Sequence, residues 1–371
     1  MFTAEIRITS IRVRPLIVRL RRPLMTSFGL FSEGPFLVVD LETSQGIVGR
    51  VPVFTFHRLG LKTVPPVLEY LASIAAAGPP VTAQNIGEMH DRWQLAMRLL
   101  GHEGVTQMAL SVFDMAVHDA LAQANGVPLW QMLGGKAASL QSYNSCGLGI
   151  AEPAAVAREA KELVSEHGGF THIKMRLGRN DAAGEVAAIK AVREAIGPSI
   201  TLSVDYNQAL PAVRALDETR AIDDLGLAWI EEPVPYDDYA TQAALTAKLR
   251  TPVQVGETWW HWRVAERAMA MRASDYIMPD LLRIGGITGW LRVARAAAAH
   301  GVPVSSHLSP EYSAHALAAT PTAHWLEFMD WGQDLLAEPL VPKAGMAALP
   351  MKPGAGIAWN ETVVARYEVR P

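Results

Sequence analysis

The spacing of hydrophobic positions along this chain changes near residue 138. Beyond that point, short apolar segments alternate with longer segments whose apolar residues recur at helical spacing, several of them ending in glycine. The pattern predicts eight strands, at 141–146, 172–178, 201–207, 227–233, 253–258, 276–281, 303–308 and 325–330. Amphipathic helices are expected between them, for example at 154–169, 182–197, 238–250 and 290–301. Eight units of this kind predict a closed parallel α/β barrel.

The first part of the chain shows a different pattern. Alternating segments at 5–20 and 36–54 predict β-strands, and Ser44-Gln45-Gly46 predicts a hairpin turn. Helical spacing follows at about 64–78, 83–100 and 105–124. We therefore predict three parts: an α+β capping domain at 1–137, a barrel at 138–340 and a C-terminal segment at 341–371 that packs back on the cap.

Composition narrows the class of protein. Half of the 371 residues are hydrophobic and the net charge is −4, which disfavours a disordered chain and a basic nucleic-acid-binding protein. Glu5 and Arg7 lie where a secretory signal needs an apolar core, which argues against such a signal. The sequence has no run of about 18 apolar residues, so no membrane helix is predicted. The single cysteine, Cys146, excludes an internal disulfide and a cysteine-rich metal site. We expect a cytoplasmic protein with no nucleic-acid or membrane partner.

Polar residues close every predicted barrel strand, and this is where enzymes with such a barrel carry their catalytic groups. One charged residue at such a position is usually a solvated loop residue, but a recurrence on all eight strands favours an active site. The residues concerned are Ser145, Lys174, Arg176, Asp205, Asn207, Glu231, Glu257, Asp280, His307 and Glu327.

Three of these residues predict a metal site. Asp205, Glu231 and Glu257 lie on consecutive strands, each 26 residues after the previous one, so their carboxylates should converge. A set of ligands that contains only oxygen favours a hard ion such as Mg2+, with Mn2+ as a substitute. Three carboxylates and one divalent ion leave a charge of −1. Lys174 and Arg176 share one face of their strand and can face that charge.

Two further groups predict acid–base chemistry. His307 and Asp280 close neighbouring strands, which lie ~4.8 Å apart, and a hydrogen bond between them would prepare the imidazole as a general base. Glu327 ends the last strand, beside the first. A further carboxylate is costly to keep charged there, so we expect it to be protonated and to donate a hydrogen bond to the substrate. An ion pair with Lys174 is the alternative.

Taken together, these motifs resemble the enolase superfamily, in particular the mandelate racemase branch of the mandelate racemase/muconate lactonizing enzyme family. The segments that carry the resemblance are DYNQ at 205–208, WIEEP at 229–233, VGE at 255–257, MPDLLRIGGITGW at 278–290, SSHL at 305–308 and SAHALAATPTAHWLE at 313–327. The resemblance implies a modified TIM barrel of the (β/α)7β type with an N-terminal α+β capping domain, and a homo-oligomer, either a dimer or an octamer.

The resemblance also implies the roles of individual residues. It implies that Asp205, Glu231 and Glu257 bind Mg2+, that His307 with Asp280 is the base, that Glu327 is an acid to the substrate carboxylate, and that Ser145, Lys174 and Asn207 contact the substrate. In this chemistry the metal and the lysine hold a small-molecule carboxylate, and the base removes the alpha proton to give an enediolate.

Arg176 departs from the racemase pattern, which has lysine at both cationic positions of this strand. To act as a base near neutral pH, a guanidinium with a pKa above ~12 would need that pKa lowered by about five units, roughly 7 kcal/mol. Two outcomes therefore stay open: racemisation with Arg176 as a weak base, and dehydration by His307 alone. A catalytically silent carboxylate-binding protein and a metal-independent glycoside hydrolase are further alternatives.

The segment 21–34, with Gly29 and Gly34, predicts a mobile lid. We expect apolar residues of this lid and of the following strand to line the substrate pocket: Leu24, Phe28, Phe31, Phe54 and Phe56. Ordinary core packing is the alternative for the last two. An apolar lid disfavours a polyhydroxy sugar acid. Racemisation of an apolar or aryl 2-hydroxy acid is therefore the leading prediction, and a dehydratase is the second.

The glycine-rich segment RIGGITG at 283–289 opens a predicted helix. Such a segment can cradle a phosphate, but its spacing is not that of a dinucleotide fingerprint. We interpret it as a tight turn and predict no nucleotide.

Overall fold

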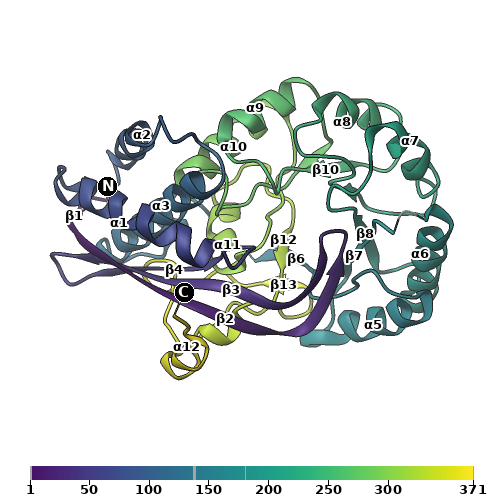
Figure 1. Ribbon diagram of the computed structural model, residues 1–371, viewed down its shortest axis with the longest axis horizontal. Helices are drawn as coiled ribbons and strands as arrows, with labels where there is room; N and C mark the ends of the chain where they lie inside the picture. The colour runs from purple at the N-terminus through teal and green to yellow at the C-terminus, as the bar shows by residue number, and fades with distance from the viewer. Residues whose placement is uncertain (1, 137–138, 180, 371) are drawn as a thin grey trace.

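The computed structural model describes residues 2–136, 139–179 and 181–370, which form a cap and a barrel (Figure 1). The predicted boundary between the two, at 137 and 138, lies outside the described residues. Within those residues, no helix has both the length and the apolar character needed to cross a membrane.

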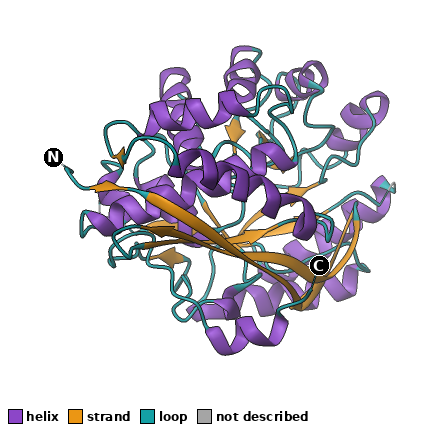
Figure 2. Ribbon diagram, turned by 60° about the vertical axis from the view of Figure 1, so that its left-hand side comes forward, coloured by secondary structure: helices purple, strands orange, loops and turns teal. Residues whose placement is uncertain are grey.

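The cap is built on an antiparallel sheet of three strands, β2 (Ile8–Thr26), β3 (Gly29–Thr43) and β4 (Val48–Phe54), in the order β2-β3-β4. The predicted turn joins β3 to β4, where Gly46 has a φ of 76° and its N–H donates to the Thr43 carbonyl at 3.0 Å. A separate pair, β1 (Glu5–Ile6) and β5 (Val81–Thr82), lies beside it. Figure 2 shows the long strands of this sheet, in orange, crossing the molecule among the helices.

Three helices of the cap lie at the predicted places, α1 (Gly60–Ala76), α2 (Ile86–Ala96) and α3 (Val105–Ala124), and α1 and α3 pack on the sheet. A short helix that was not predicted, α4 (Leu129–Met132), follows them. Nearly every residue of α3 is buried, because this helix packs against α1 and β4 of the cap and against α10 of the barrel. A single helix thus forms much of the contact between the two parts.

The barrel strands run parallel in the order β11-β10-β9-β8-β7-β6-β12. They are β6 (Leu140–Asn144), β7 (His172–Arg176), β8 (Thr201–Asp205), β9 (Ile230–Glu231), β10 (Val253–Val255), β11 (Tyr276–Ile277) and β12 (Leu326–Phe328). The seventh predicted strand, 303–308, appears only as isolated parallel bridges. Val304 pairs with Ile277 and with Ala323, and His307 pairs with Asp280. These bridges place the segment between β11 and the chain that leads into β12.

A helix follows each of the first seven strand positions and lies on the outside of the ring (Figure 1). These helices are α5 (Pro153–Ser165), α6 (Ala182–Ile196), α7 (Ala212–Arg220), α8 (Tyr239–Thr246), α9 (Trp262–Ala270), α10 (Gly286–His300) and α11 (Pro310–Ala318). In α5 the buried residues Val156, Ala160 and Leu163 recur at helical spacing and face the strands. The described elements therefore confirm the predicted (β/α)7β barrel with its cap.

The C-terminal segment contacts both parts of the molecule. β13 (Met346–Ala347) pairs antiparallel with β6, and α12 (Glu361–Tyr367) reaches the cap sheet. Arg14 of β2 donates to Glu361 at 2.6 Å, and the Val369 N–H donates to the Pro15 carbonyl at 2.9 Å.

The hairpin formed by β2 and β3 extends over the carboxyl ends of the barrel strands (Figure 1). At its tip the Ser27 hydroxyl donates to the Asn207 carbonyl at 3.0 Å, and the Ile150 N–H donates to the Met25 carbonyl at 2.8 Å. The predicted lid forms the end of a β-hairpin, with a register shift between Arg19 and Leu24. Its mobility stays a prediction.

Candidate active site

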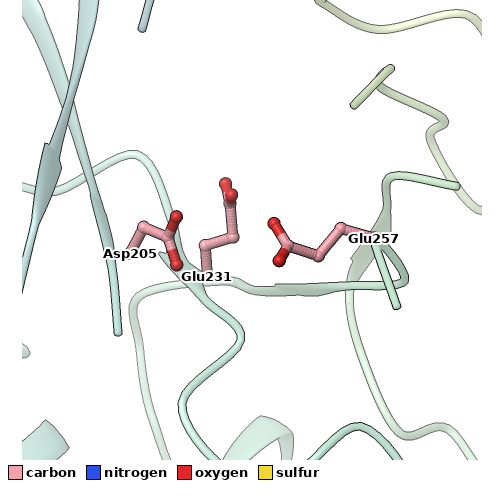
Figure 3. A group of neighbouring side chains, drawn as sticks. All are labelled: Asp205, Glu231 and Glu257. Atoms are coloured by element: carbon pink, nitrogen blue, oxygen red, sulfur yellow. The ribbon is translucent and has the colours of Figure 1, made fainter. Parts of the chain in front are cut away.

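Three carboxylates meet at the carboxyl ends of neighbouring strands (Figure 3). Asp205 ends β8 and pairs in register with Glu231, which ends β9. Glu257 follows β10. One oxygen from each lies within 4.8 Å of the others, and all three side chains are buried. Burial and the neighbouring negative charges raise the pKa of Glu231 and of Glu257. A divalent cation would remove this repulsion, and three carboxylate oxygens are the ligands that Mg2+ prefers.

Lys174 lies beside the carboxylates on β7 and is almost completely buried. Its ammonium contacts Glu231, lies 2.9 Å from Glu327 Oε1 and lies 3.5 Å from Asp205 Oδ2. Burial alone would lower the pKa of Lys174, but the three carboxylates raise it above its ordinary value. The side chain is therefore a fixed positive charge at the edge of the metal site.

Glu327 is held as a carboxylate. Besides the Lys174 contact, Oε1 accepts from the Ser145 hydroxyl at 2.7 Å and Oε2 accepts from the Leu308 N–H at 2.8 Å. Burial would raise the pKa of Glu327, but the positive charge of Lys174 outweighs it and the net shift is downward. The expectation of a protonated Glu327 was wrong, because it did not count these three donors. The alternative, an ion pair with Lys174, is observed.

His307 and Asp280 form the predicted pair. Nδ1 of His307 donates to Asp280 Oδ2 at 2.8 Å, and Asp280 Oδ1 accepts from the Leu282 N–H at 2.7 Å, which fixes the carboxylate. The other ring nitrogen, Nε2, lies 3.3 Å from Glu257 Oε2. Burial lowers the pKa of His307, but Glu257 and Asp280 together raise it to about 9. The ring thus has one nitrogen fixed by Asp280 and the other facing the metal site; its role as the base stays a prediction.

Arg176 uses its guanidinium to bind the chain after β6. Nη1 donates to the Ser145 and Gly147 carbonyls at 2.7 and 2.8 Å, and Nη2 donates to the Ser145 hydroxyl at 2.7 Å. Ser145 is completely buried between Arg176 and Glu327 and does not line the cavity. We had expected it to contact the substrate, but in the structure it lies beneath the residues that line the cavity. Its hydroxyl instead links the arginine to the carboxylate.

A cavity of about 310 Å³ opens over these groups. Apart from Ser145, the substrate-contacting residues expected from the sequence line it: Lys174, Leu24, Phe28, Phe31, Phe54, Phe56 and Asn207. Asn207 donates through Nδ2 to Asp205 Oδ2 at 2.9 Å, while its buried Oδ1 has no hydrogen-bond partner in the described part of the chain. Phe54 belongs to the core as well, since its ring lies 5.3 Å from that of Phe36. The cavity therefore combines a charged floor with an aromatic wall.

Phe56 has an unusual backbone. Its φ is 60°, and the His57 N–H donates to the Thr55 carbonyl at 2.6 Å. Phe56 is therefore the central residue of a three-residue turn, a conformation that residues other than glycine rarely adopt. The ring lies nearly parallel to that of His307, at 10° with centroids 6.4 Å apart. Such strain is found where a site requires one particular side-chain position.

Sequence reasoning missed several cavity residues, chiefly Arg283 and Trp331. Arg283 lies 3.9 Å from the centre of the Phe56 ring and donates to the Glu257 carbonyl at 2.8 Å. The signal that could have found it is a lone cation within an otherwise uncharged segment, three residues after Asp280. Trp331 packs on Phe31 and Phe54, and its position after the last strand carries no such signal.

A parallel barrel with three converging carboxylates able to hold a metal ion, a buried lysine and a histidine–aspartate pair at its strand ends is typical of a metal-dependent class of barrel enzymes. Comparison with known proteins agrees. Residues 155–363 match the family model described as enolase C-terminal domain-like, and residues 8–134 match the N-terminal domain of mandelate racemase / muconate lactonizing enzyme. The chain belongs to the mandelate racemase/muconate lactonizing enzyme family of the enolase superfamily.

Two solved structures resemble the whole chain. An enolase from alpha proteobacterium bal199 with bound magnesium is 39% identical, with a TM-score of 0.94, over 98% of this chain and all of its own. An enolase from Bradyrhizobium, in complex with magnesium and mandelic acid, is 39% identical, with a TM-score of 0.93, over 99% of this chain and all of its own. With the acidic triad described above, these structures support Mg2+ as the cofactor.

Relatives of known activity catalyse more than one reaction. L-talarate/galactarate dehydratase from Salmonella typhimurium is 32% identical over 75% of this chain and 69% of its own length. Other relatives are racemases, epimerases and cycloisomerases. The comparisons support an enzyme of the enolase superfamily.

Proposed function

We propose that the protein removes the alpha proton of an apolar or aryl 2-hydroxy carboxylate to give an enediolate, with His307 as the base. One observation carries this proposal: Nε2 of His307, the ring nitrogen that Asp280 does not bind, lies 3.3 Å from Glu257 of the carboxylate triad, and His307 lines a cavity with an aromatic wall. A base would be useful there, because a substrate carboxylate bound in this cavity would have its alpha proton within reach of the ring.

Each charged group has a task in this proposal. Magnesium, when held by Asp205, Glu231 and Glu257, supplies the positive charge that stabilises the enediolate. Lys174 adds a second positive charge beside it, and its raised pKa keeps it protonated throughout. Asp280 binds Nδ1 of His307, so Nε2 is the nitrogen that faces the metal site, and the raised pKa of the ring, about 9, favours proton uptake there.

The face opposite His307 decides the overall reaction. Racemisation needs a proton acceptor there, but Nη1 of Arg176 already donates both of its hydrogens to backbone carbonyls. Removing a proton from this group would break one of those bonds, besides the high cost of deprotonating a guanidinium. We therefore propose chemistry with one base, in which His307 abstracts the proton and then assists the departure of a beta-hydroxyl as water. This reverses the ranking expected from the sequence.

Racemisation of the same class of acid is the second candidate. It is favoured by the Bradyrhizobium relative, whose complex contains mandelic acid, an acid without a beta-hydroxyl. For this candidate Arg176 would have to act as a weak base.

The cavity lining favours an apolar substituent in either case. The ring of Trp331 packs on those of Phe31 and Phe54, and the three residues line one part of the cavity. Opposite them, Thr258 accepts hydrogen bonds from Gln208 and Arg283, each at 3.0 Å, so these polar groups already bind one another. A polyhydroxy acid would find few free partners along such a surface.

The proposal is tested by hydrogen exchange at the alpha carbon. (R)-Mandelate, (S)-mandelate and 3-phenylglycerate are each incubated with the protein and Mg2+ in deuterium oxide and followed by proton NMR. We expect one mandelate enantiomer to exchange its alpha proton with retention, and 3-phenylglycerate to give phenylpyruvate. The His307→Asn variant should lose both reactions.

The other outcomes separate the alternatives. Loss of optical rotation with either mandelate enantiomer would support the racemase. Thermal stabilisation by a carboxylate without any exchange would contradict both reactions and indicate a silent binding protein. The expected homo-oligomer is tested separately, by sedimentation of the purified protein.

A further inference from the structure

The segment from Asp280 to Thr288 joins β11 to α10 and carries two groups of the candidate active site. Asp280 binds His307, and Arg283 binds the backbone carbonyl of Glu257. The same segment contains the glycine pair Gly285-Gly286, for which a tight turn was predicted. The segment therefore contacts both the proposed base and a proposed metal ligand.

The carboxylate of Asp114, a residue of the cap, lies against the glycine pair Gly285-Gly286. Asp114 of α3 accepts from the Thr288 N–H at 2.9 Å and from the Thr288 hydroxyl at 2.6 Å, at the first turn of α10. A side chain at Gly286 would lie 2.6 Å from Asp114 Oδ2, so only glycine allows this approach. The amino end of a helix attracts negative charge, and here Asp114 supplies it.

A second hydrogen bond from the same helix reinforces this contact. The Ser111 hydroxyl, one turn before Asp114, accepts from the Gly285 N–H at 3.0 Å. Gly285 has a φ of 103°, which turns its N–H toward the cap. Two residues of α3 thus hold the segment at two points, just after Arg283.

Two histidines also contact the Asp114 carboxylate. The side chain is completely buried, with His90 Nδ1 at 3.0 Å from Oδ1 and His118 Nδ1 at 3.3 Å from Oδ2. Burial would raise the pKa of Asp114, but the two histidines lower it below the ordinary value. A buried carboxylate with this many donors has one preferred geometry, because losing any donor leaves charge unpaired.

We propose that Asp114 is a positioning residue of the active site: its carboxylate fixes the segment 280–288 and thereby the orientation of Asp280 and Arg283. In this way the cap takes part in assembling the catalytic groups of the barrel. The activity part of the inference rests on the proposed function; the structural part does not.

Asp119 provides a matched control. It lies on the same helix and is also buried, but it accepts from the Ala355 N–H at 2.6 Å and the Arg50 N–H at 2.8 Å. It therefore ties α3 to the C-terminal segment and to β4, and not to the segment 280–288.

The test compares Asp114→Asn with Asp119→Asn in the full chain with Mg2+, by amide hydrogen exchange and mass spectrometry. Asp114→Asn should raise exchange in peptides covering 280–288 by roughly tenfold or more, because the segment opens locally. Asp119→Asn should leave those peptides unchanged. With mandelate, Asp114→Asn should lower kcat for alpha-proton exchange about tenfold and leave KM within roughly twofold, since the base and not the cavity is misplaced.

The outcomes are distinguishable. Full protection of 280–288 in Asp114→Asn, or equal loss in both variants, would overturn the inference and leave Asp114 a purely structural residue. If Asp114→Asn does not fold, Thr288→Val removes only the hydroxyl donor, and the same peptides should show a smaller increase; no increase overturns the inference. If the wild type exchanges no alpha proton, the proposed function fails, and amide exchange still decides the structural part.

Discussion

Replacing Arg176 by lysine tests the reasoning about the second face of the substrate. In the structure the guanidinium spans two carbonyls and one hydroxyl, from Ser145 and Gly147. A lysine carries its donors on one nitrogen and cannot match that planar arrangement. The substitution therefore releases a cationic amine into the cavity that Arg176 lines.

The size of the effect follows from two terms. Losing one hydrogen bond from a charged donor costs about 1.5–3 kcal/mol, so we expect the variant to unfold at a lower temperature. The ordinary pKa of lysine is ~10.4, against at least ~12.5 for arginine, so the neutral base is at least ~100-fold more abundant at a given pH. Exchange from the face opposite His307 should increase by about this factor.

The assay follows each mandelate enantiomer separately, by alpha-proton NMR in deuterium oxide and by polarimetry. The wild type should exchange one enantiomer only, and Arg176→Lys should exchange both and racemise. A thermal melt with and without Mg2+ shows whether the variant is folded. Rapid racemisation by the wild type would refute the reasoning, because the hydrogen-bonded guanidinium would then be an efficient base.

Three further predictions concern the metal, the cavity wall and the cap. Glu257→Gln should weaken Mg2+ binding at least roughly tenfold by calorimetry, because one charged ligand is lost, and chelation of the wild type should abolish exchange until Mg2+ is restored. Phe56→Ala should raise KM for mandelate about tenfold, ~1.4 kcal/mol, with little change in kcat; an unchanged KM would remove Phe56 from the cavity wall. Burial raises the pKa of Asp119 to about 6, so the folded state holds this proton more tightly than the unfolded state. The free energy of unfolding should fall by roughly 3 kcal/mol as pH rises through about 4 to 6, a change that Asp119→Asn should remove in denaturant titrations.

Much of the barrel could be predicted from the sequence, because strand and helix periods are local properties of the chain. The positions of Asp205, Glu231 and Glu257 followed from that pattern, since parallel strands bring their carboxyl ends to one side of the sheet. The seventh strand was less predictable, because at 303–308 only Val304 and His307 form bridges to their neighbours.

The charge states and contacts of the site were not predictable in the same way. Glu327 was expected to be protonated, but its pKa is set by Lys174, which is distant in sequence and adjacent in space. Ser145 was expected to contact the substrate, yet its hydroxyl binds Arg176 and Glu327 and the residue is completely buried. Each of these outcomes depends on distances between strands that no local pattern contains.

By itself, the sequence determined the barrel, the acidic triad and the pairing of His307 with Asp280, since each follows from strand order and spacing. Only the tertiary structure decided which groups the Arg176 guanidinium binds, and which side chain packs against Gly285 and Gly286. That pair suits an anion, but the anion is Asp114, which lies 174 positions from Thr288 in the chain. The physical reason is that hydrogen bonds and pKa values depend on neighbours in space, and those neighbours are fixed only when the cap and barrel pack together.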